Sequence, residues 1–292
     1  MTGLAAPPPL GATPLPPGSF DGRTVLVTGG GTGIGKAIAT EFGRLGAAVA
    51  VAGRDPGHRA AGVRAVEEAG GRALGIEVDV REPDAIAAAF DAVEAELGTV
   101  SVLVNNAAGN FPALARELSP GGWRAVTSIV LDGTYFCSRE FARRLIDREQ
   151  DGSIVSIAAT YAWTGGPGTA ASAAAKAGVV NLTQSLAVEW APWGIQVNAI
   201  APGLFPHSDH VSAMRSARPD GYAAEGGRIP AGRTGEVREL GWAAALLCSP
   251  YLRYVTGHTL VVDGGNWLRR GLRMPEFVSV DEQIAQMKAG EG

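Results

Sequence analysis

Side chains that can donate or hold a proton gather in the run SIAATYAWTGGPGTAASAAAKA, which spans residues 156–177. The run contains a phenol, Tyr161, a primary amine, Lys176, and a hydroxyl, Ser172, four residues before the lysine. A phenol with an ordinary pKa near ~10 is a far stronger acid than a serine hydroxyl. Tyr161 is therefore the candidate proton donor. The alternative is that Tyr161 is a partly buried aromatic residue packed against Trp163.

A candidate hydrogen-bond donor, Asn110, lies in an earlier part of the chain. Asn110 follows the apolar run Ser101–Val104, and Tyr161 follows the apolar run Ser153–Ile157. Both runs are typical of buried strands. Open α/β sheets bind ligands beyond the carboxyl ends of their parallel strands, so both side chains are expected at one site. Asn110 can also be explained as a turn residue that precedes Phe111.

Short apolar runs alternate with helix-length amphipathic segments from Arg23 onward. The runs that predict strands are Thr24–Val27, Ala47–Ala52, Ala73–Val78, Ser101–Val104, Ser153–Ile157, Gln196–Ile200 and Thr259–Val262. The segments that predict helices are Ile34–Leu45, Pro83–Leu97, Trp123–Arg148, Ala170–Trp190 and Val237–Cys248. This alternation predicts the α/β class: a single doubly wound Rossmann domain with a mainly parallel seven-stranded sheet.

Composition divides the chain into three parts. Residues 1–19 are rich in proline and predict a flexible N-terminal tail, with a Pro-rich partner-binding segment as the alternative. Residues 20–265 form the Rossmann-type domain, in which the polar stretch 203–230 breaks the alternation and predicts a substrate-covering segment. Residues 266–292 form a C-terminal extension.

A glycine-rich loop, TGGGTGIGK, follows the first predicted strand and opens the first predicted helix. Glycines let the backbone turn sharply and approach a pyrophosphate, which then rests on the N-terminus of the helix. The alternative is a tight structural turn, but the placement between strand and helix favours dinucleotide binding. The predicted contacts from this loop are Gly29, Gly31, Thr32, Gly33, Ile34 and Gly35.

The end of the second strand bears on the choice of cofactor. Gly53 and Arg54 stand where an NAD-preferring site usually has an acid, and Lys36 adds positive charge nearby. Because a guanidinium can pair bidentately with a 2′-phosphate, the cofactor is predicted to be NADPH/NADP+. The alternative is that Arg54 is simply solvated and Asp55 takes the role of the acid.

Two further strand ends are expected to contact the cofactor. Asp79 and Val80 follow the third strand, where the adenine would lie, and Asn106 and Ala107 follow the fourth. The small residues after the fourth strand leave room for a ligand, although a plain turn would look similar.

Composition excludes several functional classes. The net charge of −4 gives no basic surface for nucleic acid or for an anionic membrane. The sequence has no apolar run of membrane-spanning length and no signal peptide, so we expect a cytoplasmic protein. Cys137 and Cys248 are expected to be buried free thiols. His207 and His210 are three residues apart in an expected loop and are interpreted as surface residues, so no metal site is predicted.

These motifs in this order resemble the short-chain dehydrogenase/reductase family. The resemblance spans roughly residues 20–265 and rests on TGGGTGIG, NNAAG, Lys176, APG at 201–203 and VDGG at 262–265. A narrower resemblance is to the 2,4-dienoyl-CoA reductases. It rests on PPGSFDG at 16–22, NNAAGNF at 105–111, IVLDGT at 129–134, GRIP at 227–230 and ASAAAK at 171–176.

The chain departs from the usual family pattern at three positions. Ser172 stands where the family usually has its catalytic tyrosine, and Ala159 stands where it usually has its serine. The dienoyl-CoA reductases also have a serine at the position of Ser172, and they have a tyrosine at the position of Tyr161. Asp132 replaces an asparagine in both groups, which puts the usual proton-relay water in doubt.

The resemblance implies NADPH-dependent reduction of a conjugated 2,4-dienoyl-CoA or a similar enoyl thioester. Asn110 and Tyr161 would donate hydrogen bonds to the thioester oxygen of a dienolate, and Tyr161 would deliver the proton. Lys176 would hold the nicotinamide ribose and favour the anion, with Ser172 as a minor hydrogen-bonding neighbour. Pro202 and Gly203 would complete the cofactor contacts. Phe111 would line the substrate site, and Arg81, Arg215 and Arg218 are candidate phosphate partners.

Two other functions stay open at this point. One is a carbonyl or enoyl reductase of secondary metabolism that uses Tyr161 as an unconventional acid. The other is a catalytically silent NADP-binding sensor, because both usual catalytic hydroxyls are missing. The family resemblance also implies a homotetramer assembled through the long helices and the C-terminal region.

Overall fold

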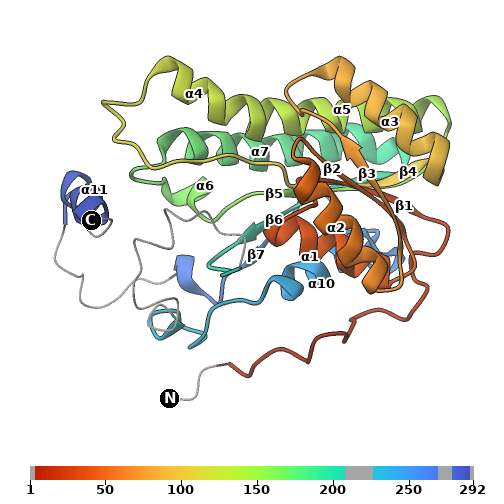
Figure 1. Ribbon diagram of the computed structural model, residues 1–292, viewed down its shortest axis with the longest axis horizontal. Helices are drawn as coiled ribbons and strands as arrows, with labels where there is room; N and C mark the ends of the chain where they lie inside the picture. Colours follow the sequence, from red (N-terminus) through yellow and green to blue (C-terminus); the bar gives the residue numbers. More distant parts are fainter. Residues whose placement is uncertain (1–3, 208–225, 269–277, 290–292) are drawn as a thin grey trace.

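The computed structural model describes residues 4–207, 226–268 and 278–289 of the chain (Figure 1). In this part, seven parallel strands form one sheet in the order β3-β2-β1-β4-β5-β6-β7. The strands are β1 (Thr24–Thr28), β2 (Ala48–Gly53), β3 (Arg72–Glu77), β4 (Val100–Asn105), β5 (Gly152–Ile157), β6 (Ile195–Pro202) and β7 (Thr259–Val262). The predicted doubly wound α/β fold is confirmed.

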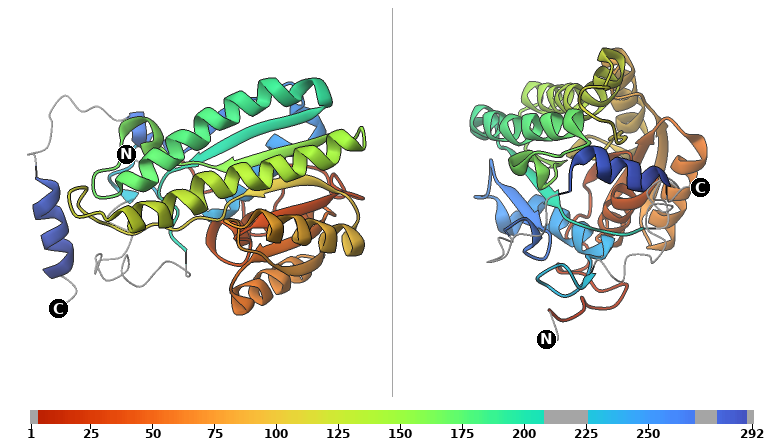
Figure 2. Two further views of the ribbon diagram at one scale, coloured as in Figure 1. Left: turned by 90° about the horizontal axis from the view of Figure 1, so that it is seen from above. Right: turned by 90° about the vertical axis from the view of Figure 1, so that its left-hand side faces the viewer.

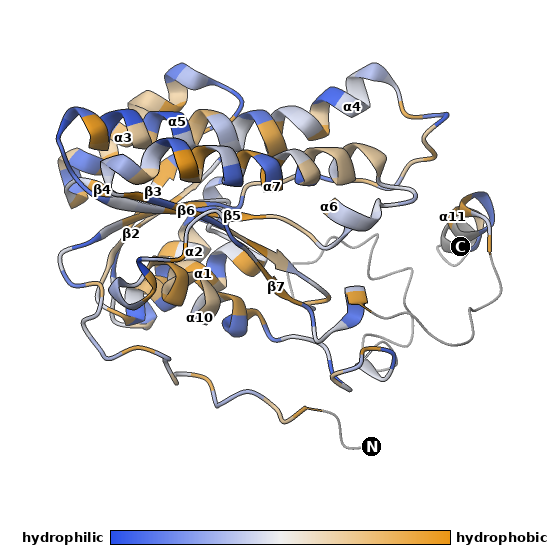
Figure 3. Cartoon of the chain, turned by 180° about the vertical axis from the view of Figure 1, so that it is seen from behind, coloured by the Kyte–Doolittle hydropathy of each residue, from blue (hydrophilic) through white to orange (hydrophobic). Residues whose placement is uncertain are grey.

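Helices cover both faces of the sheet (Figure 1). One face carries α1 (Gly33–Arg44), α2 (Pro56–Glu68) and α10 (Val237–Cys248). The other face carries α3 (Pro83–Leu97), α4 (Pro120–Thr127), the π-helical turn η1 (Ser128–Asp132), α5 (Gly133–Asp147) and α7 (Ala170–Trp190). Hydrophobic and hydrophilic residues alternate along these helices, as in helices that bury one side (Figure 3).

Four elements differ from the sequence-based expectation. The helix α2 was not predicted, because it buries only Gly62 and Val66 and therefore lacks a clear apolar stripe. The single helix predicted over 123–148 is interrupted by η1. The short helices α6 (Tyr161–Thr164) and α11 (Val280–Ala289) were not predicted either.

The order of the strands creates a crevice between β1 and β4. The chain moves outward from β1 to β3 and then crosses back to β4 on the other side of β1. Connections at such a switch point diverge above the carboxyl ends of the two strands and leave a space for a ligand. The core on either side is tightly apolar, with Val27, Ile38 and Phe42 fully buried on the α1 face.

The described parts of both terminal segments lie outside the sheet and the helices that cover it (Figure 2). Residues 4–19 run along α10, where the Trp242 indole donates to the Ala12 carbonyl at 2.9 Å. The backbone N–H of Leu4 donates to the Ala231 carbonyl at 2.7 Å. At the other end, α11 lies beyond the ends of α4 and α7 (Figure 2).

Cys137 and Cys248 are buried free thiols, as expected. Burial raises the pKa of each thiol to about 12, so neither side chain is a thiolate near neutral pH. Among the described helices, none has the length and apolar character needed to cross a membrane.

Candidate active site

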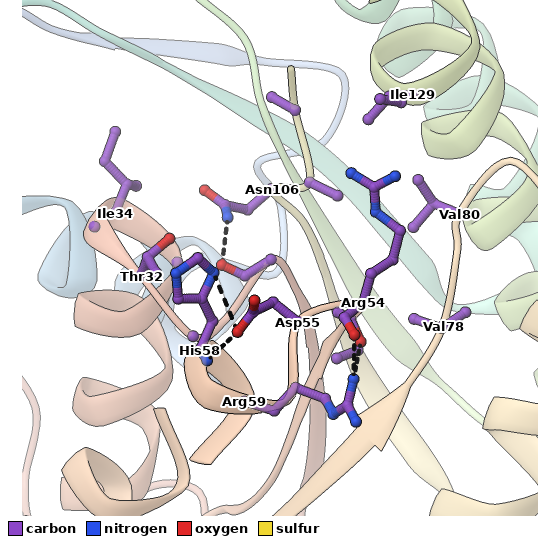
Figure 4. A pocket seen from close by; sticks show the side chains of 18 of the residues that line it. Thr32, Ile34, Arg54, Asp55, His58, Arg59, Val78, Val80, Asn106 and Ile129 are labelled. Atoms are coloured by element: carbon purple, nitrogen blue, oxygen red, sulfur yellow. Dashed lines mark hydrogen bonds and ion pairs between the residues drawn. The ribbon is translucent and has the colours of Figure 1, made fainter. Parts of the chain in front are cut away.

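A cavity of about 730 Å³ lies at the carboxyl ends of β1 to β4 (Figure 4). Most of the predicted cofactor contacts line it: Gly29, Gly31, Thr32, Gly33, Ile34, Gly35, Arg54, Asp79, Val80, Asn106 and Ala107. Sequence reasoning did not identify His58, Arg59, Ile129 and His207, which also line it. A cavity of this size, open at a topological switch point, suits a ligand as large as a dinucleotide.

The glycine-rich loop is shaped as a cradle at the N-terminus of α1. Gly29 and Gly33 have φ angles of +64° and +48°, a region that side chains disfavour. A Cβ on Gly31 would collide with the backbone carbonyl of His58, and one on Gly29 would lie 2.9 Å from the Asn106 amide nitrogen. Gly33, Ile34 and Gly35, in the first turn of α1, line the cavity, and the N-terminus of a helix is a favourable place for an anion.

Hydrogen bonds across the switch point hold this cradle in place. The Thr28 hydroxyl accepts from the backbone N–H groups of Asn106 and Ala107, each at 3.0 Å. The Asn106 side-chain amide donates to the carbonyls of Thr28 and Gly29, each at 3.1 Å. These hydrogen bonds join the loops after β1 and β4, and residues of both loops line the cavity.

Charges at the end of β2 favour an anionic group beside Arg54. The Asp55 carboxylate accepts from the His58 N–H at 2.7 Å and caps α2, and this bond lowers the pKa of Asp55. Asp55 therefore caps α2 and also lines the cavity. The Arg54 side chain is 63% exposed at the cavity, and its guanidinium lies 3.9 Å from the Asp79 carboxylate. Asp79 is held more tightly by Arg81, whose hydrogen bond lowers the pKa of that carboxyl.

The proton-transfer candidates meet at the start of α7. The Tyr161 phenol oxygen lies 3.0 Å from the Ser172 hydroxyl oxygen, which is within hydrogen-bond distance. Lys176, one helical turn after Ser172, is buried and its ammonium donates to the carbonyl of Ile157 at the end of β5. Burial lowers the pKa of Lys176 to about 8. The Trp163 ring packs against the ring of Trp267 in a tilted arrangement, with the two ring centroids 5.2 Å apart.

The loop that carries Asn110 runs beside the loop that follows Tyr161. Asn110 itself is exposed. Three residues later, the backbone N–H of Ala113 donates to the Gly168 carbonyl at 2.8 Å and ties the two loops together. Phe111 is 43% exposed on the same loop.

The three departures from the family pattern have distinct surroundings. Ala159 and Ser172 are both buried. Asp132 is exposed and ends the π-helical turn η1, a feature that is frequent at functional sites. Leu131, the residue before it, packs against Gly178 of α7, so η1 adjoins the helix that carries Lys176.

Several predicted residues lie apart from the cavity. Arg81 is paired with Asp79, two residues before it. Pro202 ends β6 and Gly203 follows it, and a Cβ on Gly203 would lie 2.5 Å from the Asp263 side chain. Arg215, Arg218 and His210 lie outside the described residues. No group of three or more His, Cys, Asp or Glu side chains that could hold a metal ion occurs within the described ranges.

Comparisons with known proteins agree with this arrangement. A family model described as enoyl-(acyl carrier protein) reductase matches residues 29–266. A Bacillus subtilis protein named "Probable 2,4-dienoyl-CoA reductase [(2E)-enoyl-CoA-producing]" is 40% identical and covers 84% of this chain and 97% of its own. The 3beta-hydroxysteroid dehydrogenase 1 of Eggerthella lenta is 38% identical over 86% of this chain and 96% of its own.

A solved structure from Agrobacterium tumefaciens with bound NADP is similar in fold. It is provisionally assigned as a 2-deoxy-D-gluconate 3-dehydrogenase and is 36% identical, with a TM-score of 0.77 over 87% of this chain and 99% of that chain.

Proposed function

The chain belongs to the short-chain dehydrogenase/reductase family, and we propose that it is an NADPH-dependent reductase of conjugated 2,4-dienoyl-CoA thioesters. The coarser description, a nicotinamide-dependent oxidoreductase, follows from the family. One observation carries the finer proposal: the phenol in contact with the helix that bears Lys176 comes from Tyr161 on α6, and Ser172 occupies the family's usual tyrosine position. The dienoyl-CoA name of the Bacillus relative supports it.

The cradle fits a dinucleotide on structural grounds. The backbone carbonyl of His58 leaves no space for a Cβ at Gly31, and the first turn of α1 lines the cavity. These amides would hold the pyrophosphate, and Lys176 would hold the nicotinamide ribose. When bound, the reduced nicotinamide supplies a hydride. Arg54 would pair with the 2′-phosphate, which is the basis for proposing NADPH rather than NADH.

The residues around Tyr161 suit a thioester dienolate. Addition of a hydride at the far end of a dienoyl thioester leaves negative charge on the thioester oxygen. Asn110 and Tyr161 would donate hydrogen bonds to that oxygen, each contributing about 3–4 kcal/mol to transition-state stabilisation. Tyr161 then gives one proton to carbon, and the product is an enoyl-CoA with one double bond fewer. Ser172 orients the phenol, and Lys176 favours the anion electrostatically.

A carbonyl reductase is the second candidate, favoured by the similarity to the Eggerthella hydroxysteroid dehydrogenase. Addition of a hydride to a ketone produces an alkoxide, which must receive a proton from a nearby acid. Ser172 is a poor acid for this purpose, so a ketone reductase would have to use Tyr161 from its different position. The same donors would then face a single carbonyl rather than a conjugated thioester.

A substrate panel separates these functions. NADPH oxidation is measured with 2,4-hexadienoyl-CoA, a 3-oxoacyl-CoA of equal length and a 3-ketosteroid. We expect turnover of the dienoyl thioester above the other two. Turnover of the ketones alone would overturn the proposal, and cofactor binding without any turnover would favour the silent sensor. The homotetramer implied by the family belongs to the same proposal and is tested by light scattering.

A further inference from the structure

A second cavity lies at the end of the sheet opposite the candidate active site. It has a volume of about 180 Å³. Ser101 and Ser153, the second residues of β4 and β5, line it, and so does Arg23, which directly precedes β1. These residues lie at the amino ends of neighbouring parallel strands, whereas the cofactor cavity lies at the carboxyl ends. The second cavity is therefore a separate site.

Two guanidinium groups in this cavity share one carboxylate. The Nη1 group of Arg23 donates to one oxygen of Asp151 at 3.0 Å, and the Nη2 group of Arg253 donates to the other oxygen. Arg253 follows the short helix η3 (Pro250–Leu252), which comes after α10. Among the described residues that line the cavity, these three carry the charged side chains, so two positive charges face one negative charge. The cavity therefore favours a further negative group.

The guanidinium groups keep N–H donors for a ligand. Each guanidinium has five N–H groups. Arg23 uses one for Asp151, and Arg253 uses one for Asp151 and one for the Ser153 hydroxyl oxygen at 3.4 Å. The side chains of Arg23, Arg253 and Asp151 are 42%, 36% and 45% exposed, and ion pairs that water reaches in this way are weak. A bound anion can therefore share the two guanidinium groups with Asp151 at little cost.

A buried hydroxyl group adds a third donor. Ser101 is 9% exposed, and its side-chain oxygen has no hydrogen-bond partner among the described residues. Buried hydroxyl groups in native proteins nearly always bond to protein, to ordered water or to a ligand. The neighbouring Ser153 hydroxyl is already engaged, since it donates to the side-chain oxygen of Gln196 at 3.2 Å. Ser101 is thus the hydroxyl in this cavity that needs an acceptor.

We propose that this cavity binds a small tetrahedral dianion of the phosphate class. Guanidinium groups bind phosphate oxygens through paired N–H donors, and the Ser101 hydroxyl donates to a further oxygen. The volume is below the range of about 300–1,000 Å³ that drug-sized ligands occupy, so it suits an ion or one terminal phosphate group rather than a nucleotide. The bound anion links the residue before β1 to the segment after α10 and stabilises the folded chain. The proposal does not depend on the proposed function.

Binding is measured through the melting temperature of the protein saturated with NADP+. The NADP+ fills the cofactor cavity, which could otherwise bind phosphate at the N-terminus of α1. Inorganic phosphate is raised while potassium chloride holds the ionic strength constant. A ligand that binds only the folded state raises the melting temperature with its concentration, so we expect stabilisation by phosphate and none by chloride. Glycerol 3-phosphate is the second ligand. Stronger stabilisation by the ester supports the site with an organic phosphate as its source, and stronger stabilisation by phosphate supports it with the free ion.

Four variants locate the phosphate, and one of them has the opposite sign. Arg23→Gln and Arg253→Gln should each weaken the apparent phosphate affinity by at least about tenfold, because each removes charge-assisted hydrogen bonds. Ser101→Ala should weaken it by about two- to tenfold. This variant should not lower the melting temperature without phosphate, because it removes a hydroxyl that has no protein partner. Asp151→Asn should tighten phosphate by a few-fold, because it removes a like charge from the cavity.

Arg143→Gln is the matched control. Arg143 is also half exposed and paired with carboxylates, Glu140 and Asp147, but it lies on α5 and does not line the cavity. Its loss should leave the phosphate affinity unchanged. Three results overturn the proposal: a native protein that phosphate stabilises no more than chloride, equal losses of affinity in Arg143→Gln and Arg253→Gln, and weaker phosphate binding in Asp151→Asn. Turnover of 2,4-hexadienoyl-CoA is a separate measurement, so failure of the proposed function leaves this test intact.

Discussion

The phenol oxygen of Tyr161 lies 3.0 Å from the hydroxyl oxygen of Ser172. The two residues come from different helices, since Tyr161 opens the short helix α6 and Ser172 lies in the first turn of α7. Lys176 follows Ser172 by one turn and is buried beside the end of β5. The contact thus places a phenol from α6 against Ser172, one helical turn from Lys176 of α7. This matters because Ser172 alone could not act as the acid.

Replacing Tyr161 by Phe tests the proposed acid. This change removes one hydroxyl, so the proton donor and one oxyanion donor are lost together. We expect kcat on a 2,4-dienoyl-CoA to fall by about 10²- to 10⁴-fold, while NADPH affinity stays within about twofold. Ser172→Ala is the matched control and should cost far less, because it leaves the phenol in place. A Tyr161→Phe enzyme that retains its full rate would reject Tyr161 as the acid.

Asn110→Ala tests the second donor. The loss of one oxyanion hydrogen bond should lower kcat by about 10²- to 10³-fold with little change in NADPH affinity. Because Asn110 is exposed, the free energy of unfolding should change by less than about 0.5 kcal/mol. Steady-state kinetics with a urea titration measures both quantities. If KM alone rose, Asn110 would be a binding residue and not an oxyanion donor.

The choice of cofactor depends on Arg54. Loss of a charge-assisted hydrogen bond costs about 1.5–3 kcal/mol, so Arg54→Ala should weaken NADPH binding by roughly 10- to 100-fold and leave NADH binding nearly unchanged. Arg64→Ala is the control, because Arg64 is an exposed arginine of α2 that is not part of the cavity lining. Equal losses for both cofactors would show that Arg54 does not contact the 2′-phosphate. Fluorescence titration of each cofactor gives the ratio.

Gly31 and Gly53 form a pair that tests the cradle. A Cβ on Gly31 would collide with the backbone carbonyl of His58, whereas one on Gly53 would meet nothing within 4 Å. Gly31→Ala must therefore displace the start of α2, at a cost of about 1–3 kcal/mol in the free energy of unfolding, and should weaken NADPH. Gly53→Ala should leave the free energy of unfolding nearly unchanged. Equal effects of the two variants would contradict the close packing of this loop.

The strands were predictable because each contains a short apolar run, and all seven expected runs correspond to strands of the described sheet. Five of these strands are mostly buried, whereas the edge strands β3 and β7 are only partly buried. The glycine-rich loop was predictable for a similar reason, since strand, glycines and helix are contiguous. The cavity-lining residues that come from distant segments were not predictable. His207 reaches the cavity so closely that a Cβ on Gly33 would lie 2.7 Å from its ring, and no local pattern signals that contact.

Two other features depend on tertiary structure. The π-helical turn η1 changes the backbone hydrogen bonding within a continuous helical pattern, and hydrophobic periodicity does not report such a change. The pairing of Arg81 with Asp79 is a local competition between two charges near a ligand site. Sequence alone shows both charges but not that they satisfy each other, so Arg81 was assigned to the substrate's phosphates.

The titration of Lys176 predicts opposite effects of rising pH on two quantities, kcat/KM and the free energy of unfolding. Burial lowers the pKa of this ammonium from 10.5 to about 8. As the pH rises through about 8, the folded protein loses the charge that favours the developing anion, so kcat/KM should fall. The unfolded chain keeps the same proton up to about 10.5, so it binds more protons than the folded state in this window. The contribution of Lys176 to the free energy of unfolding should therefore rise between pH 8 and 10.5.

Lys176→Met separates this contribution from the other titrating groups. The variant has no titrating group at this position, so the free energy of unfolding of the native protein should rise relative to that of the variant as the pH increases from 8 to 10.5. Urea unfolding and initial rates are measured in parallel from pH 7 to 10. A native kcat/KM that is flat across this range, together with a stability difference that does not change with pH, would show that Lys176 does not titrate here. Its role would then be confined to holding the ribose.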